Sequence, residues 1–399
     1  MSAVTPVVSE VLPTAEQHGI VAHSDGAGSV VPVQTRSERF TSVDPSEFPA
    51  VTGQEADWKL TPVPLVRPLI DDTLDGSPYQ YSSTETDGIF VEWIDRTDAR
   101  VGSAGAPEEK ASANAWSSFE KALSITVRGD EPSHVTVNRD SLGSGARAGH
   151  TVITAEPNSR GIVILQNNGE ALLSENVEVV VGDGAHLTVV SVQEWADDAI
   201  HLSSQFASVG RDAYLKHVVV SLGGKVVRVN PSVHLNETGA DGELYGVYFA
   251  DAGQHLEQRV YAHHVAPNTR SRVNYKGALN GASARTVWVG DVLIGPDAAG
   301  TDSYESNRNL VLSEGTRADS IPNLEIQTGD IAGAGHASAT GRFDDEHLFY
   351  LQARGITEEE ARRLVVLGFL TEVVQKIGAR ELEARLLVAI EAELGGGIA

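Results

Sequence analysis

The 399-residue chain contains no cysteine. This absence excludes disulfide bonds, thiolate metal ligands and cysteine nucleophiles on this polypeptide. Neither a redox compartment nor a catalytic role can therefore be argued from sulfur. A metal or cluster site that needs a thiolate would have to obtain it from a second protein chain, so the absence points to a partner.

Basic charge and long apolar runs are also scarce. The 30 Lys and Arg residues stand against 55 Asp and Glu, for a formal net charge of -25. Binding to nucleic acid or to an anionic membrane is not expected, because both need a basic surface. No stretch approaches the ~20 apolar residues that span a bilayer, and the N-terminus has no basic segment before a long apolar core. We expect a cytoplasmic protein.

Motifs for nucleotide binding and for serine hydrolysis are missing. The sequence has neither a Gly-Lys-Ser/Thr phosphate loop nor a Gly-x-Ser-x-Gly turn. We therefore expect this chain to bind no nucleotide and to hydrolyse none. Its 41% apolar content is nevertheless enough for a large buried core.

Composition divides the chain into four regions. Residues 1–35 are rich in Ser, Thr, Gly, Ala and Pro and are predicted to form a mobile arm. Residues 36–122 form a mixed N-terminal region, in which the Pro-punctuated run ending near Pro68 is expected to be extended. Residues 123–335 are almost wholly β in pattern, and residues 336–399 are helical.

A loose repeat lies within the β region. Gly-x-x-Ala or Gly-x-x-Gly recurs there, usually before a strand-like run, and begins at Gly182, Gly210, Gly239, Gly281 and Gly315. Tight turns at such intervals suit the stacked coils of a β-helix, in which neighbouring coils bury a shared core. An antiparallel sandwich with small residues at its turns is the alternative. We predict a mainly β fold, a parallel β-helix or β-solenoid, flanked by a small N-terminal region and C-terminal α-helices.

The C-terminal region predicts helices with clear boundaries. Asp344 can cap a helix that stops at Gly355, and Thr357-x-x-Glu360 is a capping-box pattern. Apolar residues then recur at helical spacing on two successive faces, which predicts two amphipathic closing helices: Val366, Leu370, Val373 and Ile377, then Leu382, Leu386, Ile390 and Leu394.

His336 is the candidate metal ligand, at the point where the β pattern gives way to helices. A neutral imidazole can bind iron or another transition metal. The small residues around it, such as Gly335 and Ala337, leave room for a cofactor or a partner backbone. A turn histidine bonded to the backbone is the simpler alternative, because one histidine does not make a site.

Three other patterns have structural explanations. The acidic run 344–346 suits the start of a helix through capping and the macrodipole. His263 and His264 are adjacent on a predicted strand and point to opposite faces, so at most one can serve any one site. Scattered acids on a β-helix also suggest a carbohydrate-active enzyme, which needs two carboxylates at a defined separation. That enzyme is the alternative function.

Ordered motifs over roughly a hundred residues, from about 254 to 356, carry a resemblance to a known family. They are Gln254-His255-Leu256, Arg259-Val260, His264-x-Ala-Pro-Asn268, Tyr275-Lys276-Gly277, Thr301-Asp302-x-Tyr304, Ser306-Asn307-Arg308-Asn309-Leu310, Asn323-Leu324-Glu325-Ile326, His336-Ala-x-x-x-Gly341-Arg342-x-Asp344, Phe349-Tyr350-Leu351 and Arg354-Gly355-Ile356. This region resembles the SufD family, a subunit of the SUF iron–sulfur cluster assembly complex. The earlier run Glu55-x-x-Trp58-Lys59-x-Thr61-Pro62 is similar to the entry segment of that family.

The resemblance implies a right-handed parallel β-helix and a non-enzymatic scaffold. It implies a SufB-like paralogue and SufC-like ABC ATPases as partners. ATP would be hydrolysed on SufC, and SufC would bind to the C-terminal helices of this chain. It further implies a transient iron–sulfur cluster, or iron, at the SufB/SufD interface. There SufB supplies cysteine, and this chain supplies the aligned histidine, His336.

Two departures qualify the resemblance. Many family members have a cysteine where this chain has Ala334, and an acidic residue where it has His263. A thiolate at the site must then come from the partner, and the lack of cysteine favours SufD over SufB. A self-associating protein, a homodimer in isolation, remains a third possibility. The candidate residues for binding the ATPase are Phe349, Tyr350, Leu367, Phe369 and Leu370.

Overall fold

The computed structural model describes residues 20–22, 30–32, 39–84, 86–342 and 345–397. The chain divides into two units between Arg39 and Phe40. In the first unit, strands β1 (Ile20–Ala22) and β2 (Val30–Pro32) pair antiparallel. The rest of the arm predicted over residues 1–35 lies outside the described residues.

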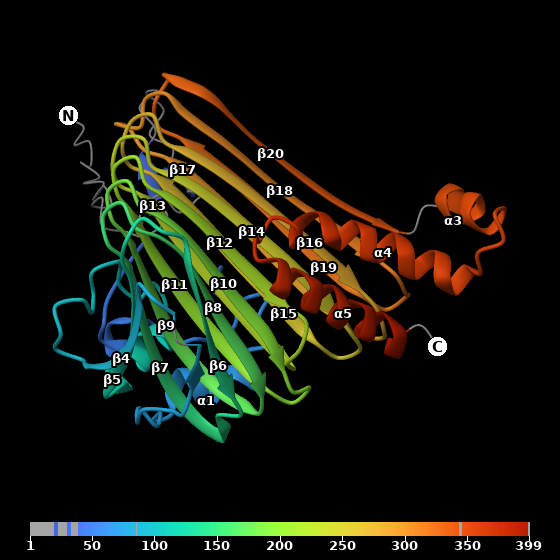
Figure 1. Ribbon diagram of the computed structural model, residues 1–399, viewed down its shortest axis with the longest axis horizontal. Helices are drawn as coiled ribbons and strands as arrows, with labels where there is room; N and C mark the ends of the chain where they lie inside the picture. Colours follow the sequence, from blue (N-terminus) through green and yellow to red (C-terminus); the bar gives the residue numbers. More distant parts are fainter. Residues whose placement is uncertain (1–19, 23–29, 33–38, 85, 343–344, 398–399) are drawn as a thin grey trace, which may run out of the picture. The chain divides into compact units, whose positions relative to one another are not determined.

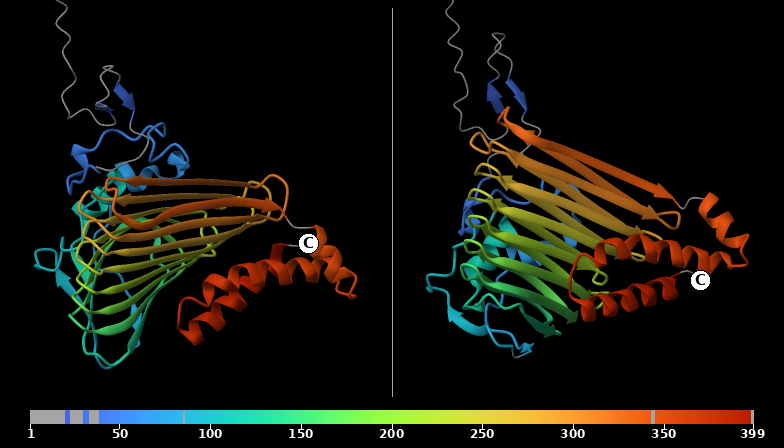
Figure 2. Two further views of the ribbon diagram at one scale, coloured as in Figure 1. Left: turned by 90° about the horizontal axis from the view of Figure 1, so that it is seen from above. Right: turned by 45° about the horizontal axis from the view of Figure 1, so that its top comes forward.

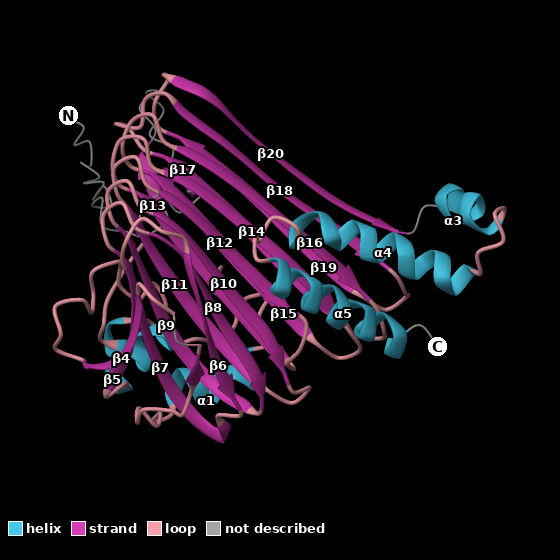
Figure 3. Ribbon diagram, viewed as in Figure 1, coloured by secondary structure: helices cyan, strands magenta, loops and turns pink. Residues whose placement is uncertain are grey.

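The second unit is built on a parallel β-solenoid of about eight turns, as predicted (Figures 1 and 3). Each coil contributes one strand to each of two sheets, and an antiparallel strand at the first edge brings each sheet to nine strands. The sheets are named here after their last strands. The β20 sheet comprises β3 (Ser82–Ser83), β6 (Ser133–Asp140), β8 (Arg160–Gly169), β10 (His186–Trp195), β12 (Tyr214–Ser221), β14 (Asp241–Ala250), β16 (Arg270–Leu279), β18 (Thr301–Val311) and β20 (Ile331–Arg342). The β19 sheet comprises β4 (Ile89–Asp95), β5 (Lys121–Val127), β7 (Gly143–Ala155), β9 (Ala171–Val181), β11 (Ile200–Val209), β13 (Val226–Leu235), β15 (His255–His264), β17 (Arg285–Ile294) and β19 (Arg317–Ile326).

The repeat marks the corners of the coils. The Ala185 N–H donates to the Gly182 carbonyl oxygen at 2.9 Å, which closes the turn from β9 to β10. At the other kind of corner, where the chain returns from β16 to β17, Gly281 has a φ of +79°, a conformation that glycine adopts without strain. Stacked coils explain the repeat, and the antiparallel sandwich was the wrong alternative.

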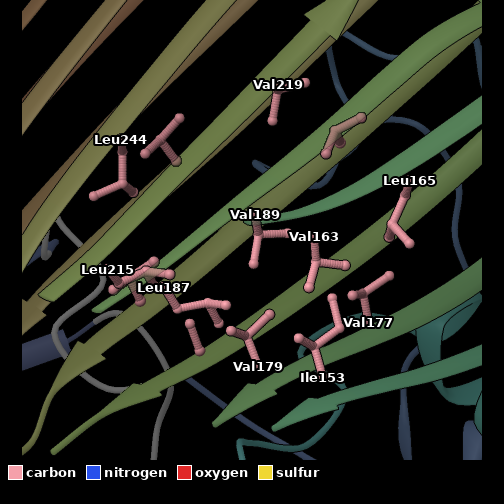
Figure 4. Packing of buried hydrophobic residues seen from close by; sticks show 14 of the residues in the cluster. Ile153, Val163, Leu165, Val177, Val179, Leu187, Val189, Leu215, Val219 and Leu244 are labelled. Atoms are coloured by element: carbon pink, nitrogen blue, oxygen red, sulfur yellow. The ribbon is translucent and has the colours of Figure 1, made fainter. Parts of the chain in front are cut away.

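Apolar side chains from the two sheets meet inside the coils (Figure 4). Alternate residues of a strand point inward, so Val163 and Leu165 of β8 face the lumen with Val189 of β10, each at most 2% exposed. Parallel pairing places Val163 directly beside Val189. The same inward position is thereby repeated from coil to coil, and each coil covers the one before it.

The mixed region contains a short 3₁₀ helix (Pro45–Glu47) and helices α1 (Val63–Asp71) and α2 (Lys110–Ser118). The extended run expected near Pro68 was wrong, since Pro68 lies inside α1. Helix formation lets Val66 and Leu69 bury completely in one cluster with α2, which offsets the backbone bond that proline cannot make.

The N-terminal region is attached to the solenoid by buried polar contacts. The Arg228 guanidinium of β13 lies 4.1 Å from the centroid of the Trp58 ring. It also pairs with Glu109 at 2.6 Å and with Glu257 at 3.3 Å. The Thr61 hydroxyl donates to Glu257 at 2.8 Å. The segment that resembles the family's entry segment, Trp58 and Thr61 included, is thus one of the parts that contact the β19 sheet.

The boundary predicted at residue 336 was wrong. Strand β20 continues to Arg342, because it pairs with β18 along its whole length. Helices follow as α3 (Asp345–Gln352), α4 (Glu358–Val374) and α5 (Arg380–Gly397). The predicted cap Asp344 lies outside the described residues, while the Glu360 N–H donates to the Thr357 hydroxyl as the capping box requires.

Helices α4 and α5 lie on the outer face of the β20 sheet (Figures 1 and 2). Helix α4 contacts β14 and β16, and Arg385 of α5 donates to Glu194 of β10 and to Gln166 of β8. The two predicted apolar faces are both buried there with residues of β12 and β14. The Lys276 ammonium of β16 is nearly buried and pairs with Glu372 of α4 at 2.5 Å. It also lies 4.7 Å from the centroid of the Phe369 ring. The helices are therefore fixed to the wall of the solenoid by both packing and charge.

A buried ion pair crosses the lumen in the first coils. Arg139 of β6 donates to both carboxylate oxygens of Glu175 of β9, at 2.5 and 3.0 Å, and neither side chain is more than 1% exposed. The His201 ring nitrogen Nε2 lies 2.9 Å from the same carboxylate. Burial alone would raise the pKa of Glu175, but the charge of Arg139 and the contact with His201 hold it well below its usual value.

Replacing Glu175 with Ala should destabilise the protein strongly, because Arg139 would be left charged and unpaired inside the core. The expected loss is about 3–5 kcal/mol in unfolding free energy, measured by urea unfolding with circular dichroism. Glu156→Ala is the matched control, since its pair with Arg128 is exposed at the surface. That change should cost less than about 1 kcal/mol. Equal effects of the two substitutions would contradict the prediction.

Acid should weaken the core through His217, which faces the lumen. Burial lowers its pKa to about 4, and its Nε2 lies 2.6 Å from the side-chain oxygen Oε1 of Gln205. The unfolded chain takes up a proton below pH ~6.5, whereas the folded chain resists it down to about 4, so stability falls as the pH is lowered through that interval. Between pH 7 and pH 5 the loss from this residue is about 2 kcal/mol. His217→Gln should remove that part of the pH dependence in urea unfolding, and an unchanged pH dependence would contradict the assignment.

Candidate functional site

The last coil leaves one end of the solenoid open. Strands β19 and β20 are the terminal strands of their sheets, each hydrogen-bonded to a single neighbour. Inward positions that are buried in earlier coils are partly exposed in these two strands. His336 lies near the middle of β20, directly beside Glu305 of β18. Its side chain is 45% exposed, which makes the imidazole accessible at this end.

Glu305 lies beneath His336, and its side chain is fully buried. The distance from its Oε1 to His336 Nδ1 is 3.6 Å, too long for a hydrogen bond. Neither carboxylate oxygen has a hydrogen-bond partner among the described residues. Burial, together with the nearby charge of Asp291, raises the pKa of Glu305 to about 8. A cation or a proton would therefore stabilise this carboxylate.

Gly290 of β17 makes room for the carboxylate. A Cβ at this position would collide with the Glu305 carboxylate and with the Trp288 ring. Strand alternation directs the missing side chain into the lumen. The space opposite Glu305 therefore depends on glycine at residue 290.

A chain of polar groups continues from the site along the last coils. The Ser338 hydroxyl donates to Ser320 at 2.8 Å, and the Ser320 hydroxyl donates to Asn307 at 2.7 Å. The Asn307 amide donates in turn to the Tyr248 hydroxyl at 2.7 Å. These bonds hold β18, β19 and β20 together, so the strand that carries His336 has a defined position.

Other residues singled out by sequence are placed as follows. Ala334 lies two positions before His336 on the same face of β20, packed against an apolar cluster that includes Val292. His264 is buried and bonds to Thr269 at 2.8 Å, and burial lowers its pKa to about 3. His263 points to the opposite face, where its ring packs against His234 at a centroid distance of 5.3 Å. The expectation that the adjacent histidines cannot share a site is confirmed.

The five residues predicted to bind the ATPase fall into two groups. Phe349 and Tyr350 of α3 are 72% and 55% exposed and are available to a partner. Leu370 lies on the inner face of α4 and is fully buried, and its neighbours Leu367 and Phe369 in the same helix are partly buried. The second group fastens α4 to the β20 sheet, so that any contact they make with a partner is indirect.

Glu305 is the site residue that sequence reasoning missed. Its signal was the alternation Ser303-x-Glu305-x-Asn307, which puts a carboxylate at an inward position that the two preceding coils fill with Leu244 and Val273. Within the described ranges, no three His, Asp or Glu side chains come together to hold a metal ion. In that same part of the chain, no helix is both long and apolar enough to cross a membrane.

Comparison with known proteins places the chain in a family. Residues 136–369 match the profile described as SUF system FeS cluster assembly, SufBD core domain. The matched segment runs from β6 into α4 and includes both His336 and Glu305. It therefore covers the solenoid and the first part of the helices that pack on it.

Two mycobacterial relatives are similar to this chain over nearly its whole length. The iron–sulfur cluster assembly SufBD family protein Rv1462 of Mycobacterium tuberculosis is 47% identical over 371 residues, covering 90% of this chain and 93% of its own. The corresponding protein ML0594 of Mycobacterium leprae is 45% identical and covers 92% and 96%. A second M. tuberculosis member, Rv1461, is 29% identical over 56% of this chain and 26% of its own. The chain belongs to the SufBD family of iron–sulfur cluster assembly proteins, and its resemblance is to the SufD type.

Proposed function

We propose that this chain is a non-catalytic scaffold subunit of an iron–sulfur cluster assembly complex in the cytoplasm, where it holds nascent iron or cluster against a partner. The observation that carries the proposal is His336, half exposed on the terminal strand at the open end of the solenoid. Its imidazole is accessible from outside the chain while the strand beneath it is fixed by hydrogen bonds. Family membership favours this role and lends no support to the carbohydrate-enzyme alternative.

The partner at this end is a SufB-like paralogue. Strands β19 and β20 each have one edge without a neighbouring strand in their sheets. Such edges bind further strands through main-chain hydrogen bonds, and a second solenoid would continue both sheets. That M. tuberculosis has a second family member besides the close relative of this chain is consistent with such a pair.

Division of ligands between the two chains follows from composition. Iron–sulfur clusters are held mainly by cysteine thiolates, with histidine replacing some of them in certain centres. This chain has no cysteine, so the SufB-like partner supplies the thiolates and this chain supplies His336. The iron or cluster is cargo of the complex, held transiently.

The helical end receives a SufC-like ABC ATPase, on which ATP is hydrolysed. Phe349 and Tyr350 present exposed aromatic rings to it, whereas Leu370 and the Lys276–Glu372 pair connect α4 to strand β16. A movement of the ATPase can thus be transmitted to the β20 sheet. Coupling of this kind requires contacts that differ between the ATP-bound and free states.

Replacing His336 with Ala should lower the yield of assembled cluster by at least about tenfold, because one ligand is lost. Complex formation with the SufB-like and SufC-like partners should persist, because the side chain is half exposed and is not part of the core. The measurement is anaerobic purification of the co-expressed complex, followed by iron and sulfide analysis. His134→Ala is the control, an exposed histidine in the first coils. A full cluster yield from His336→Ala would refute the ligand role.

Removing the two exposed aromatic rings of α3 should weaken binding of the ATPase. The double substitution Phe349→Ala and Tyr350→Ala is expected to lower affinity about tenfold or more, since buried aromatic residues dominate such interfaces. Retention of the SufC-like protein during co-purification, followed by calorimetry, measures the effect. Phe90→Ala changes an equally exposed ring on β4 and should have no effect. ATPase binding that survives the double substitution unchanged would remove α3 from the interface.

The mass of the isolated chain tests the remaining possibility of a homodimer. The same open edges could pair with a second copy when the paralogue is absent. Light scattering of the chain alone, and then beside its partners, distinguishes self-association from assembly with the paralogue. A homodimer that persists unchanged in the presence of both partners would contradict the proposed pairing.

A further inference from the structure

One inward position can be followed through every coil of the β20 sheet. Strand pairing places its residues side by side in a single ladder, which runs Val135, Val163, Val189, His217, Leu244, Val273, Glu305 and His336. Most members are aliphatic and belong to the core (Figure 4). The last two are a carboxylate and an imidazole. Apart from His217, whose imidazole is bonded to Gln205, the ladder is apolar until the open end of the solenoid, where it changes to metal-ligating chemistry.

Glu305 lacks the partners that other carboxylates in the lumen have. Glu175, also fully buried, is held by an arginine and contacts a histidine. Glu305 has no hydrogen bond to either oxygen among the described residues, and the only nearby titratable base that the structure pairs with it is His336, at 3.6 Å. Leaving a buried carboxylate without partners costs several kcal/mol, so this position needs an explanation.

The spacing of the two side chains fits ligands of one ion. First-row divalent ions bind imidazole nitrogen and carboxylate oxygen at about 2.0–2.2 Å. Two such ligands at tetrahedral or octahedral angles lie about 3.0–3.4 Å apart. The observed 3.6 Å between Glu305 Oε1 and His336 Nδ1 is a few tenths of an ångström longer, which a small side-chain rotation would close.

We propose that Glu305 is a second ligand beside His336, and that the two form a half-site for ferrous iron at the mouth of the solenoid. This inference rests on the proposed function, because it takes His336 to be the accessible ligand. Imidazole together with carboxylate suits Fe(II) that is not yet part of a cluster, because neither ligand depends on sulfur. The carboxylate also offsets the charge of an ion that enters this buried part of the lumen.

Gly290 completes the half-site. It leaves the space opposite Glu305 that any side chain would occupy, and the carboxylate lies where a Cβ at residue 290 would be. Trp288 walls the same space, with an indole nitrogen that has no hydrogen-bond partner among the described residues. Ordered water between this nitrogen and Glu305 is the competing explanation. In that case the carboxylate would be a structural group and not a ligand.

Anaerobic titration of the full-length chain with Co(II), a spectroscopic substitute for Fe(II), tests the proposal. Wild type should bind one equivalent of Co(II), and the visible absorption bands of the bound ion should indicate an imidazole ligand. Glu305→Gln should weaken binding about 10–100-fold while its circular dichroism and thermal midpoint show a folded protein. His336→Ala should weaken binding similarly. The binding free energy lost in the double variant should be smaller than the sum of the losses in the two single variants, because both residues hold the same ion. Glu314→Gln, an exposed change in the turn after β18, is the matched control.

Each result decides between the proposals. Co(II) binding by Glu305→Gln that equals wild type, together with a defective His336→Ala, overturns the Glu305 ligand and leaves the proposed function standing. A lowered thermal midpoint in that same variant, with Co(II) binding unchanged, would assign Glu305 to a structural role through lumen water. No Co(II) absorption from wild type up to about 1 mM metal overturns the half-site. A full cluster yield in the complex carrying His336→Ala instead overturns the proposed function itself.

Discussion

Parallel stacking of one coil on the next is the constraint on which the molecule depends. Each strand satisfies its backbone through the coils on either side, and each inward side chain is covered by its counterpart in the next coil. A stack of this kind must end somewhere. At β19 and β20 the hydrogen bonds and the cover both stop, so this end combines open strand edges with accessible inward residues. Binding capacity is thus a direct consequence of where the stack terminates.

Polar residues inside the lumen divide according to that geometry. In the first coils, Arg139 and Glu175 neutralise each other within a closed core, where they serve structure. In the last coils no described residue plays this part for Glu305, and His336 is half exposed. An inward-facing polar residue is therefore structural in a covered coil and available for chemistry at the open end. Burial and the number of neighbouring coils distinguish the two roles, and residue type does not.

The C-terminal helices extend the same wall outward. Helices α4 and α5 bury their apolar faces on the β20 sheet, and the Lys276–Glu372 pair ties α4 to β16. Strand β16 is separated from β20 only by β18. A helix surface on which a partner could act and the strand bearing His336 are thus joined through three hydrogen-bonded strands. This continuity gives a physical route from one end of the proposed complex to the other.

Sequence alone predicted what local chemistry determines. Glycine at the corners, the capping box at Thr357 and the apolar faces of α4 and α5 could all be identified, because each depends on residues close together in the chain. Family motifs also pointed to His336. Sequence could not pair Glu305 with His336 or continue β20 to Arg342. Turns between strands differ in length, so the register that brings distant residues together arises only from strand pairing in the folded solenoid. Tertiary structure therefore decided the site, because its geometry depends on contacts between coils that no local pattern records.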